Sequence, residues 1–229
     1  MIVADPPLIV RPTPQELDAE LDRIAASVEE YRAGLGRDRQ LIFDRYSVVD
    51  LAHKVVGVGS VGTLCWVVLL ESGDGEPLFL QFKEATTSVL EAHLGLSEFP
   101  HSGQRVVEGQ QLVQAASDVF LGWARFSRRD GTSTDFYVRQ LWDGKASVDI
   151  PALGPKRLAR YARFCGLVLA RAHARSGDAA MISGYLGEDD AFDRAVAQFA
   201  VAYAERNRSD HARLTDAVRD GELEALPDL

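Results

Sequence analysis

The chain has 229 residues, of which 46% are hydrophobic and 26% are charged, so it can bury a sizeable core and is not disordered throughout. Its formal net charge of -9 argues against a general nucleic-acid binder, because phosphate neutralisation requires clustered Lys and Arg. The first ten residues lack a basic segment and no apolar run reaches bilayer length, so we expect no signal peptide, no membrane partner and a cytoplasmic protein. Cys65 and Cys165 lie in apolar runs, and we expect buried free thiols.

The first predicted element is an amphipathic helix. Thr13 and Glu16 have the spacing of a capping box, and Pro14 stands at the first helical position. Apolar residues then recur at helical spacing as far as Leu35, which predicts one buried stripe. A short helical turn is expected at about residues 41–46.

A block rich in β-branched and aromatic residues follows, and it predicts an antiparallel sheet. We expect five strands, at 51–58, 63–71, 78–84, 119–126 and 136–141. Glycine-containing turns separate them at 57–62, at 72–75 and at Asp130-Gly131. Residues 104–116 have the pattern of a helix inserted before the fourth strand.

Residues 143–155 are polar and form the best linker candidate. Beyond them, residues 158–172 are apolar on almost every side and predict a deeply buried helix. A second helix is expected at 192–203, and Ser209 is expected to cap a last one. The predicted division is therefore an N-terminal helical segment at 1–47, a β-lobe at 48–142 and a helical subdomain at 143–229.

The segment Gly57-Val58-Gly59-Ser60-Val61-Gly62 has the Gly-x-Gly-x-x-Gly pattern of a phosphate-binding loop. Glycines let backbone N–H groups approach a phosphate without a side-chain clash. In a dinucleotide-binding fold this loop must open a helix, but residues 63–70 favour a strand. The order strand, glycine loop, strand, hairpin and strand with a lysine is that of a protein-kinase N-lobe. The predicted fold class is thus α+β, with a kinase-like five-stranded antiparallel lobe and helix followed by a helical subdomain.

This interpretation assigns a role to each candidate residue. Lys83, on the third strand, would contact the α and β phosphates of a nucleotide, and Glu108 would hold Lys83 in place, with Glu91 as the second candidate. The last strand would supply an adenine-side hinge through its backbone groups. The predicted phosphate loop consists of Gly57, Gly59, Ser60 and Gly62, and the predicted hinge of Arg139, Gln140 and Leu141.

Simpler interpretations remain open at each position. The glycine segment could be only a tight turn, Lys83 an edge-strand lysine and Glu108 an ordinary exposed helix residue. Two rival functions also remain. One is a non-catalytic binding or remnant module of the same fold, and the other is a dinucleotide-binding oxidoreductase, which would require a helix at 63–71.

Several longer motifs resemble the bacterial family catalogued as domain of unknown function 2252. They cover roughly residues 40–215, which is most of the chain, and are more specific than a lone glycine pattern. The motifs are Lys54-Val55-Val56-Gly57-Val58-Gly59-Ser60-Val61-Gly62-Thr63, Gln104-Arg105-Val106-Val107-Glu108-Gly109-Gln110, Gln114-Ala115-Ala116-Ser117-Asp118, Tyr137-Val138-Arg139-Gln140-Leu141 and Ala170-Arg171-Ala172-His173-Ala174-Arg175-Ser176-Gly177-Asp178.

The resemblance implies a distant, permuted relative of protein-kinase-like phosphotransferases that uses ATP and Mg²⁺. Longer members of the family carry an upstream half with motifs similar to a kinase catalytic loop and metal-binding loop. This chain resembles the downstream half alone, so a separately encoded upstream half is an expected partner. By the same resemblance, His173 and Asp178 stand where a catalytic loop would begin, although a structural turn pair explains them equally well. The metal ligands stay unassigned.

Overall fold

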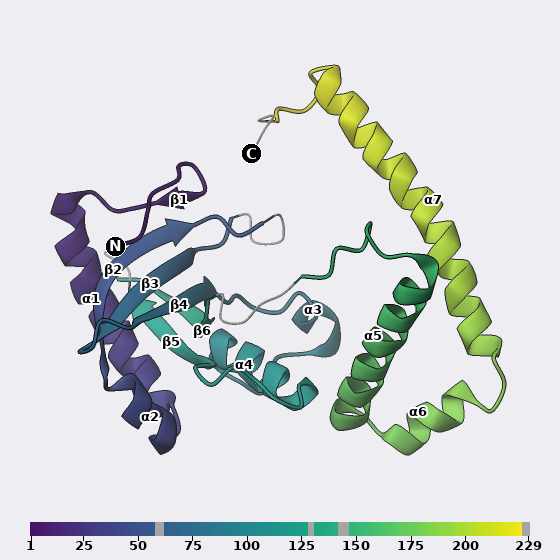
Figure 1. Ribbon diagram of the computed structural model, residues 1–229, viewed down its shortest axis with the longest axis horizontal. Helices are drawn as coiled ribbons and strands as arrows, with labels where there is room; N and C mark the ends of the chain where they lie inside the picture. Colours follow the sequence, from purple (N-terminus) through teal and green to yellow (C-terminus); the bar gives the residue numbers. More distant parts are fainter. Residues whose placement is uncertain (58–61, 128–130, 142–146, 226–229) are drawn as a thin grey trace. The chain divides into compact units, whose positions relative to one another are not determined.

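The computed structural model describes residues 1–57, 62–127, 131–141 and 147–225. Its centre is one antiparallel sheet with the strand order β1-β2-β3-β4-β6-β5 (Figure 1). The α+β class is confirmed. The strands are β1 (Ile9–Val10), β2 (Tyr46–Lys54), β3 (Cys65–Ser72), β4 (Pro77–Glu84), β5 (Gly122–Ser127) and β6 (Ser133–Gln140).

The sheet has six strands among the described residues, so the predicted number of five was wrong. The additional strand, β1, is two residues long and pairs with the end of β2, where Ile9 faces Lys54 and Val10 faces His53. A strand of two residues is too short to show the alternation of apolar and polar residues by which strands are predicted. β2 also begins earlier than predicted, at Tyr46, and it contains an irregularity in register between Val48 and Asp50.

One face of the sheet is covered by α1 (Pro14–Gly34), which α2 (Arg37–Phe43) follows. The predicted capping pair is confirmed, because the backbone N–H and the hydroxyl of Thr13 both donate to the carboxylate of Glu16. Tyr31 is fully buried, and its hydroxyl donates to the carbonyl of Phe120 at 2.5 Å. The main core lies between α1 and alternate residues of the strands, which include Leu51, Val68, Leu70, Leu78, Leu80, Phe82, Phe136 and Val138.

The segment between β4 and β5 forms α3 (Glu91–Leu94) and α4 (Ser102–Val113). The helix predicted at 104–116 is confirmed as α4, which packs against β6 and β5. Figure 1 shows α1 and α4 on opposite sides of the sheet. α4 lies so close to β6 that a Cβ atom at Gly103 would stand 2.2 Å from the carbonyl oxygen of Phe136.

The chain forms two compact units, Met1–Ser176 and Gly177–Leu229. The first ends with α5 (Pro155–Ser176), and the second contains α6 (Ala179–Leu186) and α7 (Ala191–Arg219). The prediction of two separate helices at 192–203 and after Ser209 was wrong, because α7 is continuous. Ion pairs at helical spacing, Arg208 with Glu205 and Arg206 with Asp210, support the helix across this segment.

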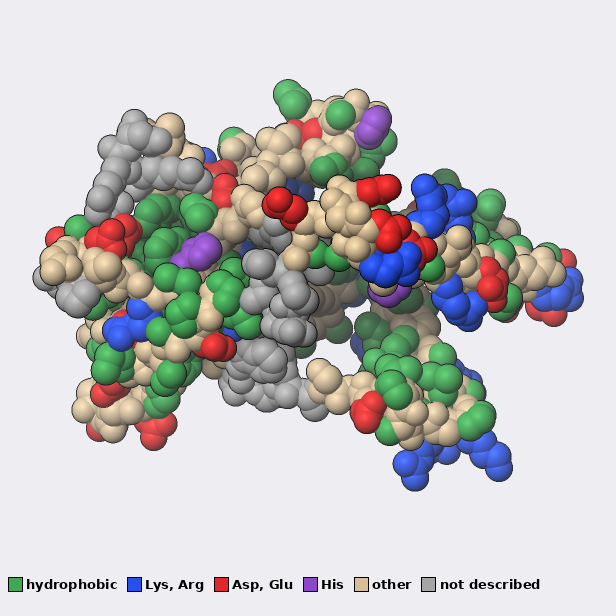
Figure 2. Space-filling model, turned by 90° about the horizontal axis from the view of Figure 1, so that it is seen from above, with side chains coloured by type: hydrophobic (Ala, Val, Ile, Leu, Met, Phe, Trp, Pro, Cys, Tyr) green, Lys and Arg blue, Asp and Glu red, His purple; other side chains and the backbone are tan. Residues whose placement is uncertain are grey.

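The prediction that α5 is deeply buried was also wrong. No residue of α5 is buried, and Phe164, Leu167 and Leu169 are each more than half exposed. Tyr161, Cys165 and Ala172 recur at helical spacing and are half-buried, whereas the other apolar side chains have no such cover among the described residues. An all-apolar pattern predicts burial only when partner elements surround the helix. Figure 2 shows hydrophobic side chains at the surface of the molecule.

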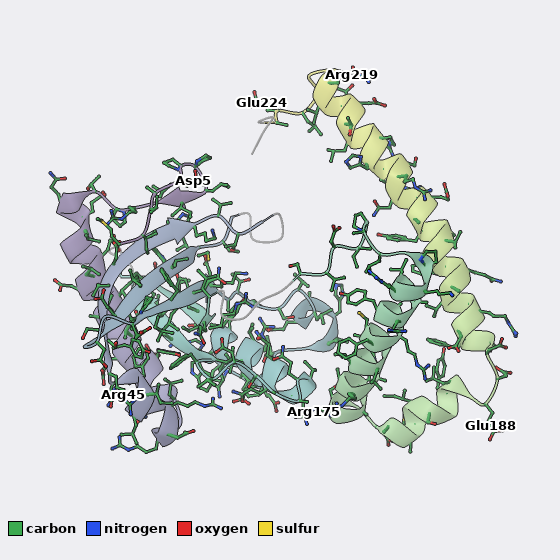
Figure 3. All side chains as sticks on the ribbon, in the orientation of Figure 1. Asp5, Arg45, Arg175, Glu188, Arg219 and Glu224 are labelled. Carbon is green, nitrogen blue, oxygen red and sulfur yellow. The ribbon has the colours of Figure 1, made fainter. Side chains whose placement is uncertain are left out.

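α5 is joined to α4 at its C-terminal end. Arg175 donates from Nε to the carbonyl of Leu112 at 2.9 Å, and its terminal nitrogen lies 3.4 Å from the carbonyl of Gln111 (Figure 3). These carbonyls belong to the last turn of α4, where a cation is favourable. α5 carries six basic residues and no acidic one. Among the described residues, no helix is both long enough and apolar enough to cross a membrane.

Candidate anion-binding site

The glycine segment joins two neighbouring antiparallel strands, as predicted. β2 ends at Lys54 and β3 begins at Cys65, and the two strands pair through His53 and Trp66. The φ angles of Gly57 and Gly62 are +95° and +83°, a region that favours glycine because it has no Cβ atom. The predicted phosphate-loop residues Gly59 and Ser60 lie outside the described residues. The segment after the glycines is a strand, not the helix that a dinucleotide fold requires.

A cavity of about 340 Å³ lies beside this segment. Four of the predicted site residues line it together: Gly57, Lys83, Arg139 and Leu141. The sheet register accounts for Lys83 and Arg139. In the antiparallel pairing, Lys83 faces Cys65 and Arg139 faces Gln81, so these four side chains share the face opposite the main core. The cavity, here called the glycine-turn cavity, is lined by Lys54, Val55, Val56, Gly57, Gln81, Lys83, Arg139 and Leu141.

Three cations, Lys54, Lys83 and Arg139, line the glycine-turn cavity, and its described lining contains no carboxylate. None of the three forms an ion pair with another residue that the structure describes. Arg139 Nε lies 3.4 Å from the side-chain oxygen of Gln81, a long contact for a hydrogen bond. Like charges held close together repel each other, so an anion would stabilise this arrangement.

The floor of the cavity is polar and buried. Gln81 is 3% exposed, and its side-chain nitrogen donates to Sγ of Cys65 at 3.3 Å. Burial raises the pKa of the Cys65 thiol, although the hydrogen bond from Gln81 and the neighbouring cations lower it. The net shift keeps the thiol neutral at pH 7. Cys65 therefore contacts Gln81 as a buried, neutral thiol.

Glu108, the predicted partner of Lys83, is half-buried on α4, next to the fully buried Val107. Neither Lys83 nor Glu108 forms an ion pair with another described residue. The second candidate, Glu91, accepts a hydrogen bond from the backbone N–H of Ser88 at 3.3 Å and is used within its own turn. The pairing of Lys83 with Glu108 stays a prediction.

Of the predicted hinge residues, Arg139 and Leu141 line the glycine-turn cavity and Gln140 does not. The backbone N–H groups of Gln140 and Leu141 already have acceptors. The N–H of Gln140 donates to Oδ2 of Asp118 at 2.6 Å, and the N–H of Leu141 donates to the carbonyl of Phe79 at 2.8 Å. By contrast, the side chain of Arg139 borders the glycine-turn cavity. The side chain of Arg139, and not the backbone N–H groups of Gln140 and Leu141, is therefore the group from this segment that can contact a ligand in the cavity.

A second cavity, of about 370 Å³, shares Arg139 with the first. Asp118 helps to shape it, because its two carboxylate oxygens accept the backbone N–H groups of Phe120 and Gln140. The sequence reasoning did not find this cavity. Its lining, here called the glutamine cavity, consists of Gln110, Gln114, Ser117, Asp118, Val119, Arg139 and Gln140.

The family described as an uncharacterized protein conserved in bacteria, DUF2252, matches residues 1–217. The chain belongs to the DUF2252 family. No match was found among curated proteins or among solved structures. The DUF2252 match begins at residue 1, earlier than the motifs at residues 40–215 had indicated. The matched residues include the linings of both cavities.

The DUF2252 match also includes the two predicted catalytic residues. His173 is exposed in the last turn of α5. Asp178 is the N-cap of α6, where its carboxylate accepts the backbone N–H groups of Ala180 and Met181 at 2.9 and 3.0 Å. Asp178 thus has a structural role in capping α6, and a catalytic role for His173 and Asp178 stays a prediction. The described residues contain no group of three or more His, Cys, Asp or Glu side chains arranged to hold a metal ion.

Proposed function

We propose that the glycine-turn cavity binds the phosphates of a nucleotide, ATP, and that the chain is the nucleotide-binding half of a kinase-like phosphotransferase. The order of elements supports this: strand, glycine turn, strand, hairpin and a strand that carries Lys83. We also propose a cytoplasmic location, which the two unpaired cysteines support because reducing compartments keep thiols free.

One observation carries the proposal. Lys54, Lys83 and Arg139 converge on one small cavity, beside the backbone of Gly57, without a described carboxylate partner. Charge-assisted hydrogen bonds from such groups to phosphate oxygens are about twice as strong as neutral ones. Glycine conformation at Gly57 would let backbone N–H groups approach the same ligand.

The same lining does not fit Mg²⁺. That ion prefers oxygen ligands, chiefly carboxylates, whereas the described lining offers three cations and one carboxamide, that of Gln81. The described lining therefore supplies no Mg²⁺ site, and we propose that the separately encoded upstream half supplies the ligands of this ion.

Substitution of Lys83 tests the binding role. Lys83→Ala should weaken ATP binding roughly 10- to 150-fold, the loss expected for one charged hydrogen bond of about 1.5–3 kcal/mol. Lys156→Ala is the matched control, because Lys156 is exposed at the start of α5 and does not line the cavity. Isothermal titration calorimetry on both variants and the parent chain measures the difference. Equal affinities would remove Lys83 from the site, and a parent chain that binds neither ATP nor tripolyphosphate would refute the proposal.

The second candidate function, a binding module without chemistry of its own, is favoured by the capping role of Asp178. We expect the purified chain to release no phosphate from ATP above background, and turnover to require the upstream half from a longer relative. Asp178→Asn should leave the fold intact, since Asn caps helices as well as Asp does. Robust hydrolysis by the chain alone that Asp178→Asn abolishes would show that this half carries the chemistry.

A further inference from the structure

We propose that the glycine-turn cavity and the glutamine cavity together form one site for a phosphorylated, polyhydroxylated ligand, a sugar phosphate. The phosphate lies among Lys54, Lys83 and Arg139, and the sugar occupies the glutamine cavity. This inference rests on the proposed function and goes beyond it, because it assigns a second cavity and a class of ligand.

The chemistry of the glutamine cavity matches hydroxyl groups. Its lining includes the carboxamides of Gln110 and Gln114 and the hydroxyl of Ser117, and none of the three forms a side-chain hydrogen bond with another described residue. Each of these groups both donates and accepts, as does every sugar hydroxyl. The carboxylate of Asp118 accepts two backbone N–H groups, so it is already engaged within the protein.

Arg139 connects the two cavities. It lines both of them and is half-buried. A guanidinium has five N–H donors in one plane, and among the described residues the Arg139 side chain makes one contact, the long one from Nε to the side-chain oxygen of Gln81. The remaining donors can contact a phosphate oxygen on one side and a hydroxyl oxygen on the other.

The sizes of the cavities agree with this division. Each measures between about 340 and 370 Å³, which lies at the lower end of the range for small-molecule sites. Cations line one cavity and neutral hydrogen-bonding groups most of the other, so the ligand should be anionic at one end and neutral at the other. A free sugar phosphate and the ribose phosphate of a nucleotide share this chemistry.

Calorimetry with three probes separates the two parts of the site: tripolyphosphate, ribose 5-phosphate and ATP. We expect the double variant Gln110→Leu/Gln114→Leu to bind ribose 5-phosphate or ATP at least roughly five-fold more weakly, because two hydrogen bonds are lost, and to bind tripolyphosphate unchanged. Gln111→Leu is the matched control, since Gln111 is on the same helix but does not line the cavity. Circular dichroism confirms that each variant is folded.

The pattern of losses identifies the ligand. A glutamine-dependent affinity for ribose 5-phosphate supports a free sugar phosphate, and one seen with ATP alone supports a nucleotide. If the double variant binds ribose 5-phosphate and ATP as the parent does, while tripolyphosphate still binds and Lys83→Ala weakens it, the inference is overturned and the phosphate site stands. If the parent binds none of the three probes, the proposed function fails as well.

Discussion

Gly103 shows how closely α4 lies against the sheet. A Cβ atom at this position would stand 2.2 Å from the carbonyl oxygen and 2.6 Å from the carbonyl carbon of Phe136, which is backbone of β6. The backbone of a central strand cannot move aside at low cost. The absence of a side chain at Gly103 therefore fixes the distance between α4 and β6, and with it the place of the glutamine cavity.

Gly103→Ala should destabilise the protein by about 1–3 kcal/mol, the usual cost of forcing additional atoms into a packed site. Gly109→Ala in the same helix is the control, because a Cβ atom there meets no atom within 4 Å. The control should be neutral or gain about 0.5–1 kcal/mol, since alanine favours a helix over glycine. Urea unfolding measures both changes, and equal free energies of unfolding would contradict the close approach.

His101 combines two roles at the start of α4. Its Nδ1 accepts the backbone N–H of Gln104 at 3.2 Å, which caps the helix, and the side chain is buried. Burial lowers the pKa of the imidazole, an effect that the carboxylate of Asp135, 3.4 Å from Nε2, opposes without reversing. The folded state thus favours neutral His101, which suits its role as a hydrogen-bond acceptor.

The stability of the fold should therefore depend on pH through His101. Because the folded pKa is depressed below the unfolded value of about 6.5, the unfolded state binds the proton first. The contribution is fully present above about pH 6.5 and is lost as the pH falls from there through the folded pKa. His101→Asn, which keeps a capping side chain, should flatten this slope in urea unfolding. The control His93→Asn changes an exposed residue and should keep the pH dependence of the parent protein. If His101→Asn also keeps that pH dependence, His101 is not its source.

At the scale of elements, the long strands of the sheet were predictable from the sequence, whereas the short strand β1 and the burial of α5 were not. β3 and β4 are both dense in apolar residues and flank the turn that contains Gly73 and Gly75, so their hairpin follows from local pattern alone. β1 depends on a distant partner, β2, and carries no pattern of its own. The error at α5 has the same origin, because composition records how apolar a helix is but not which elements cover it.

The junction between α5 and α4 depends on Arg175. Its guanidinium donates to the carbonyl of Leu112 at the end of α4, and α5 is otherwise weakly covered. Arg175→Ala should therefore loosen α5 without unfolding the sheet. We expect amide hydrogen exchange in α5 to accelerate roughly ten-fold, corresponding to about 1.4 kcal/mol. Arg171→Ala, which removes a cation from the same helix without a described partner, should change exchange much less; equal effects would contradict the role of Arg175.

At the scale of the whole molecule, part of the candidate site was readable from the sequence. The alternation of β4 places Gln81 beside Lys83 on one face, and the glycine pattern locates the turn above them. The inclusion of Lys54 and the position of Arg139 required the strand order, which brings β2 and β6 to the two ends of the same cavity. The glutamine cavity required in addition the packing of α4 on the sheet, and packing leaves no local signal.

The composition of α5 has a practical consequence for handling the protein. α5 carries six positive charges and no negative ones, so the rest of a chain with a net charge of -9 carries -15. The sequence pI of about 5.1 reflects only the sum of the positive charge on α5 and the negative charge on the rest of the chain. Retention on an ion-exchange resin depends on the charges that face it within about 10 Å at 0.1 M salt. At low salt and neutral pH, a sulfonated resin should therefore retain this acidic protein through α5, while a quaternary-amine resin retains it through the remainder.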